Sequence, residues 1–186
     1  MNPIRMLLLA VVACALAYGA GSTVEASHPG AVAPVAASGA AWEGGVSNID
    51  ELVKRFLSAV ERKDRDELER LRIDERDYLG IILPGTVEPG QPLQRVDRER
   101  AGPFWWEYLS ERSALHRDGI LDAFGGHHFE IVERQFTKGV KQYANHAAHR
   151  RLRLVLRDEN GEQRELQTGS IAEVDGRFKF ISYVRD

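Results

Sequence analysis

Histidine and tyrosine side chains are the groups in this sequence best suited to proton transfer near neutral pH. His127 and His128 stand at the start of a predicted strand, while Tyr108 and Tyr183 lie in a predicted helix and a predicted strand. An imidazole titrates close to neutrality and can act as a general base, and a tyrosine hydroxyl can donate to a carbonyl oxygen. One such base and one such donor would serve a cofactor-free isomerase or dehydratase. No local motif unites them, so we assign no residue a catalytic role.

Aromatic residues are concentrated in one segment that contains Phe104, Trp105, Trp106 and Tyr108. Such a segment supplies core residues to a helix, or it lines a pocket for an apolar ligand. Two adjacent tryptophans cannot share one helix face, so we expect at least one of them at a cavity mouth or an interface. The candidate ligand-binding residues are Trp105, Tyr108, His127, His128 and Tyr183.

The sequence predicts no metal site and no cofactor. His146 and His149 are close in sequence, but a zinc site needs three or four converging ligands, and an odd offset along a strand places two side chains on opposite faces. There is no glycine-rich phosphate loop, no G-x-S-x-G motif, and no cysteine beyond Cys14. These absences argue against nucleotide-dependent enzymes and typical serine or cysteine hydrolases, but they do not exclude acid–base chemistry.

A basic run, HRRLR at 149–153, is a candidate site for an anionic ligand. The alternative is a solvated strand face whose cations pair with Glu162, Glu165 and Glu173 across the sheet. The formal net charge is −3, which disfavours nucleic acid as a partner.

The N-terminal region has the composition of an export signal followed by a spacer. Residues 1–17 read as a signal peptide, with Arg5 before an apolar stretch and Ala15-Leu16-Ala17 as the cleavage site. The apolar stretch falls short of the ~20 residues that span a bilayer. Residues 18–46, rich in Ala, Gly and Pro, read as a flexible linker. We therefore expect a periplasmic or secreted protein; an uncleaved anchor and lipid attachment at Cys14 remain alternatives.

Residues 47–186 have the length of one domain, and its first part reads as helical. Ser47 is the predicted N-cap of a helix with an apolar stripe from Ile49 to Val60. Asp64 starts a second helix, and a third is expected over 78–82, ending before Pro84. A loop is expected over 84–97, then one helix from Pro103 and a separate helical piece over 118–124, closed by Gly125-Gly126.

The second part reads as strands. They are expected over 128–137, 149–157 and 164–174, with a last strand after Asp175-Gly176. Leucines alternate with arginines over 151–157, and Asn160-Gly161 and Asp175-Gly176 favour hairpin turns. Helices followed by a mostly antiparallel sheet predict an α+β fold.

Two segments resemble the nuclear-transport-factor-two-like superfamily, which includes SnoaL-like and ketosteroid-isomerase-like proteins. They are FLSAVERKDRDEL at 56–68 and GSIAEVDGRFKF at 169–180, and the resemblance covers 47–186. It implies N-terminal helices packed on a strongly curved sheet, a cystatin-like cone with a pocket at one end. Members include isomerases, dehydratases, noncatalytic binders and dimeric scaffolds. The tyrosine-plus-buried-acid arrangement of the isomerases has no residue-by-residue counterpart here, although Asp118, Asp122 and Glu130 lie in the corresponding region.

The resulting hypothesis is an exported, noncatalytic domain that binds a small apolar molecule or a protein partner in its conical pocket, with a homodimer as a further possibility. The first alternative is the cofactor-free isomerase or dehydratase with a histidine base and a tyrosine donor. The second is an envelope-associated scaffold held by its N-terminus, which is the case in which the protein contacts a membrane.

Overall fold

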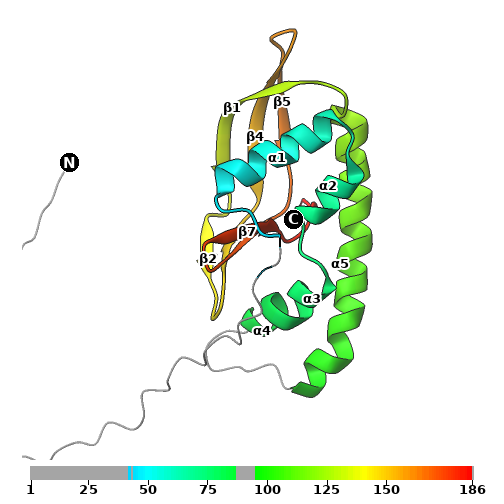
Figure 1. Cartoon of the computed structure of the whole chain (residues 1–186), viewed down its shortest axis with the longest axis vertical. Coiled ribbons are helices and arrows are strands. Elements are labelled where there is room, and N and C mark those ends of the chain that lie inside the picture. The colour runs from blue at the N-terminus through cyan, green and yellow to red at the C-terminus, as the bar shows by residue number, and fades with distance from the viewer. Residues whose placement is uncertain (1–41, 43, 87–94, 186) are drawn as a thin grey trace, which may run out of the picture. The chain divides into compact units, whose positions relative to one another are not determined.

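The computed structural model describes residues 42, 44–86 and 95–185, and shows an α+β domain in which helices precede antiparallel sheets (Figure 1). The predicted signal peptide, Cys14 and most of the predicted linker lie outside the described residues. Among the described helices, none combines the length and apolar character needed to cross a bilayer.

The first two helices begin at side-chain caps. Helix α1 (Ile49–Glu61) is capped by Asn48, whose side-chain oxygen accepts from the Glu51 amide at 2.7 Å. The predicted cap, Ser47, is therefore one residue early, and its hydroxyl instead donates to the Glu51 carboxylate. Asp64 caps helix α2 (Arg65–Arg70) as predicted, accepting from the Glu67 amide. Side-chain oxygens satisfy amides that have no partner inside a helix, which is why these positions start helices.

The third helical segment is longer than expected. It comprises α3 (Glu75–Asp77), a π-helical turn η1 (Tyr78–Ile82) and α4 (Leu83–Gly85). The predicted end before Pro84 is wrong, because Pro84 lies in the first turn of α4, where a helix has no need of its missing N–H. The expected loop over 84–97 is shorter on both sides, and residues 87–94 lie outside the described residues.

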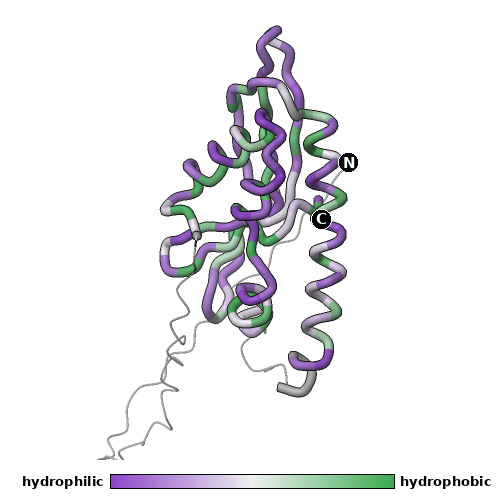
Figure 2. The backbone as a smooth tube through the Cα atoms, turned by 45° about the vertical axis from the view of Figure 1, so that its right-hand side comes forward, coloured by the Kyte–Doolittle hydropathy of each residue, from purple (hydrophilic) through white to green (hydrophobic). Residues whose placement is uncertain are grey.

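Helix α5 (Arg95–Phe124) is one continuous 30-residue helix with Pro103 inside it, so the prediction of two separate helices is wrong. The helix packs closely beside the proline: a Cβ on Gly102 would lie 2.8 Å from a Leu79 methyl group and 3.1 Å from one of Leu83. The close approach holds α5 against the preceding helical segment. The predicted C-terminal stop is confirmed, since Gly126 has φ +89° and its amide donates to the Glu61 carbonyl. Apolar and polar residues alternate along α5 (Figure 2).

The strands form two antiparallel sheets. One has the order β1-β4-β5 and the other β2-β3-β6-β7. The strands are β1 (Phe129–Phe136), β2 (Val140–Gln142), β3 (Ala147–His149), β4 (Leu152–Asp158), β5 (Gln163–Gln167), β6 (Ile171–Val174) and β7 (Arg177–Phe180).

The breaks between strands correct two predictions. The expected strand over 164–174 is two strands, β5 and β6, that belong to different sheets, and β2 and β3 were not anticipated. Backbone hydrogen bonds nevertheless continue through the breaks: the Thr137 amide donates to Arg151, Arg150 to Gly139, and Thr168 to Leu152. Arg151 has φ +56°, an unusual value for a residue with a side chain. The segments that carry β1 and β2, β3 and β4, and β5 and β6 therefore remain neighbours from one sheet into the other.

Both predicted hairpins are present. Asp175 and Gly176 have φ +49° and +71° between β6 and β7, as a type I′ turn requires. Between β4 and β5, Gly161 has φ +83°, and the Asp158 side chain accepts from the amides of Asn160 and Glu162.

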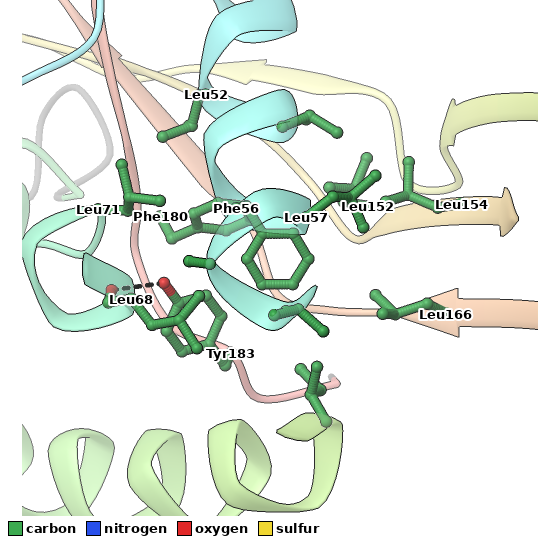
Figure 3. Close-up of a cluster of buried hydrophobic side chains, with 14 of the residues drawn as sticks. Leu52, Phe56, Leu57, Leu68, Leu71, Leu152, Leu154, Leu166, Phe180 and Tyr183 are labelled. Carbon is green, nitrogen blue, oxygen red and sulfur yellow. Dashed lines mark hydrogen bonds between the residues drawn. The ribbon is translucent and has the colours of Figure 1, made fainter. Parts of the chain in front are cut away.

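The main core lies between α1 and the sheets (Figure 3). The alternation along β4 is confirmed, because Leu152, Leu154 and Leu156 are all fully buried. The ring of Phe56 on α1 lies 5.0 Å from that of Phe180 and 5.7 Å from that of Tyr183. The amphipathic helix and the leucine face thus bury each other, which is the main favourable contribution to folding.

Candidate functional site: a groove between α5 and β5

The predicted aromatic site residues lie on the outer surface of α5. Trp105 and Tyr108 are about half exposed, and their rings meet edge to face at 6.2 Å. Arg112 donates to the Tyr108 hydroxyl at 3.0 Å. Trp106 instead packs on Tyr78 and under the Arg72 guanidinium. The two tryptophans therefore lie on different faces of α5, while the prediction that one of them lines a cavity mouth or an interface stays a prediction.

The two predicted histidines lie at the surface, beside two different carboxylates. His127 Nδ1 is 3.0 Å from Glu159, and His128 Nδ1 is 3.2 Å from Glu61. The hydrogen bond with His127 is the main cause of the lowered pKa of Glu159. Both imidazoles therefore lie in exposed contacts with carboxylates rather than in the groove lining.

Tyr183 belongs to the core. Its hydroxyl donates to the Leu68 carbonyl at 2.6 Å, and burial raises its pKa well above the usual value. Its donor is thus already used inside the protein. The structure brings Trp105 and Tyr108 together, but it gives His127, His128 and Tyr183 other, separate partners.

A buried ion pair and a buried histidine lie away from the predicted site residues. Lys179 donates to Asp77 at 2.6 Å with both side chains buried, and its ammonium lies 5.5 Å from the Trp42 ring centre. His146 is buried, stacks on Tyr143 and has its pKa lowered to about 4 by desolvation. Both groups sit in packed surroundings. No cluster of three or more metal-ligating side chains occurs within the described ranges.

Two members of the basic run, Arg153 and His149, lie against carboxylates of the sheet. Arg153 donates to Glu165 at 2.7 Å and to Glu133 at 3.2 Å, and His149 lies 2.8 Å from Glu173. The expected pairing with acidic neighbours is therefore confirmed for Glu165 and Glu173. This pairing offsets the charge of Arg153, whereas Arg150 donates to the Lys138 carbonyl.

A groove of about 400 Å³ lies between the C-terminal half of α5 and strand β5. Its apolar lining comes from Leu115, Ile120 and Phe124 on α5 and from Leu166 on β5; His116, Gly119, Glu165, Gln167 and Arg185 complete it. At one end Arg164 lies over the Phe124 ring and donates to the Ala123 carbonyl at 2.8 Å. The groove is within the size range of ligand pockets and has the expected mixture of an apolar lining with a few polar groups.

Sequence reasoning missed this groove although a signal was present. Positions 115, 116, 119, 120 and 124 recur at the spacing of one helix face. The expected division of α5 into two helices obscured that face. Its other wall is a strand about forty residues later, and the pairing of those two elements is a tertiary property.

Comparisons with known protein families, with curated proteins and with solved structures found no match to this chain.

Proposed function

We propose that this chain is an exported, noncatalytic binding domain and that it binds an apolar ligand or a segment of a protein partner in the groove between α5 and β5. The groove itself is the observation that carries the proposal: it joins an apolar lining to an exposed cation, Arg185, in a volume of about 400 Å³. Export rests on the composition of residues 1–17.

We also propose that the two sheets are halves of one strongly curved, cone-like sheet of the nuclear-transport-factor-two-like kind. The backbone hydrogen bonds through the breaks at Thr137, Arg150 and Thr168 support this relation. The positive φ of Arg151 and the glycine at 169 supply the local bends. A Cβ on Gly169 would lie 2.4 Å from the Ser182 carbonyl oxygen, so only glycine fits beside the C-terminal segment there.

The groove is a better binding site than the interior of the cone. The space between α1 and the sheets holds the rings of Phe56, Phe180 and Tyr183, all with almost no exposure. The isomerase alternative has less support, because its proposed base and donor residues have separate partners. The scaffold alternative is supported by the exposed rings of Phe104 and Trp105, which could contact another protein. Self-association is compatible with the groove proposal.

Decanoate is a suitable probe because its chain matches the apolar lining and its carboxylate matches Arg185. In amide NMR titrations of the full chain, we expect shift changes at 115–124 and 163–167. Gly119→Leu should fill the groove and abolish them, since nothing lies within 4 Å of an added Cβ. Gly80→Leu is the matched control, because Gly80 has the same open space in η1, outside the groove lining. Absence of binding at millimolar decanoate, or equal loss in both variants, would contradict the proposal.

A further inference from the structure

Strand β5 is an edge strand whose free side faces away from β4. In the sheet order β1-β4-β5, its only neighbour within that sheet is β4. The Thr168 amide donates to Leu152, and the Asp158 amide donates to Glu162. These two bonds show that the even-numbered residues of β5 are the ones whose backbone groups bond to β4. Because antiparallel pairing alternates, the amide and carbonyl groups of Glu165 and Gln167 point away from β4.

These outward groups line the groove. Glu165 and Gln167 both belong to its lining, and neither backbone amide has a hydrogen-bond partner among the described residues. An open strand edge with free donors and acceptors is a template for an added strand. Opposite this edge, α5 presents Leu115, Ile120 and Phe124. A binding segment would therefore find backbone partners on one wall and apolar contacts on the other.

The charges of the groove favour an acidic occupant. Glu165 accepts from Gln167 and from Arg153, and these hydrogen bonds, together with the charges of Arg153 and Arg185, hold its pKa below the usual value. Arg153 also pairs with Glu133, so it offsets part of the Glu165 charge on the outer face of the sheet. Arg185 is exposed and also lines the groove. It follows Val184, whose carbonyl lies beside Gly169, so this cation is on the C-terminal side of β5.

We infer that β5 binds an extended peptide segment of another protein as an additional strand. The segment carries apolar side chains at alternate positions, which face α5, and an acidic side chain at the Arg185 end. From Leu115 to Phe124 the helix rises about 13 Å at 1.5 Å per residue, so the groove holds about four extended residues at 3.4 Å each. This inference rests on the proposed function and names the class of partner.

The first experiment selects peptides from a random twelve-residue phage library against the full chain. The peptides that bind should share alternating apolar residues and one Asp or Glu. The tightest is then synthesised with each amide N-methylated in turn. Strand addition predicts that methylation at every second position weakens binding at least tenfold, while intervening positions change it less than twofold. The inference would be overturned if methylation weakened binding equally at every position, or if affinity depended on peptide side chains three and four apart, as in a helix. Failure to select any peptide would overturn it too.

Two protein variants test the same geometry. Gln167→Pro removes an outward amide that β4 does not use, and edge strands tolerate proline; we expect it to lose the peptide. Arg185→Glu should exchange the preference for an acidic residue with one for lysine, whereas Arg157→Glu, exposed on β4 outside the groove, should not. If Gln167→Pro is unfolded, the methylation scan still decides.

The outcomes separate the two proposals. Decanoate binding in the groove with no alternation in the methylation scan would refute strand addition alone. If the native protein bound neither decanoate nor any peptide, the proposed function would be refuted as well. Concentration-dependent dimers that Gln167→Pro abolishes would identify a second copy as the occupant, which also contradicts the inference.

Discussion

Replacing Lys179 by methionine should strongly destabilise the domain, because it leaves the Asp77 carboxylate buried without its partner. The two side chains are 5% and 2% exposed and their charged atoms are 2.6 Å apart. Removing one member of such a pair costs about 3–5 kcal/mol. For a chain of this size, each kcal/mol lowers the melting temperature by about 2–4 °C, so a loss on the order of 10 °C is expected.

The assay is a double-mutant cycle measured by urea unfolding. Asp77→Asn alone should cost a similar amount, since it leaves the ammonium unpaired. The double variant should cost about as much as one single variant, giving a coupling energy on the order of 3 kcal/mol. Arg65→Met is the control, because its ion pair with Asp118 is largely exposed and such pairs contribute under about 1 kcal/mol. Additive single effects below about 1 kcal/mol each would show that the pair is hydrated and would refute this reasoning.

Three further predictions concern helix capping, the core and pH. Asn48→Ala should cost about 1 kcal/mol in urea unfolding, because the Glu51 amide loses its acceptor; no change would mean that α1 begins elsewhere. Leu154→Ala should cost about 2–5 kcal/mol, since the side chain is fully buried between α1 and the sheet, and a smaller loss would indicate a loosely packed core. His146 has a folded-state pKa of about 4 against 6.5 unfolded, so the unfolded state takes up the proton first and stability falls as pH drops from 6.5 towards 4. Relative to His146→Gln, the native protein should lose stability over that window in pH-dependent unfolding, and parallel curves would contradict the assignment.

Local patterns accounted for much of the domain. The sequence predicted the amphipathic stripe of α1, the cap at Asp64 and the turns at Asp175-Gly176 and Asn160-Gly161. Each of these features depends on residues that are close together in the sequence. The leucine face of β4 followed from strict alternation. For the candidate site, the sequence did not indicate which residues lie together, since His127, His128 and Tyr183 have partners that lie 32, 67 and 115 residues away.

The sequence by itself determined the class of fold, the placement of helices before strands and the positions of the tight turns, because propensity and periodicity act over a few residues. Only the tertiary structure decided where the strands break, that Lys179 is buried against Asp77, and that the face at 115–124 lies opposite the free edge of β5. Each of these depends on contacts between segments distant in sequence, whose free energy is set by burial and hydrogen bonding in the folded chain and leaves no local pattern.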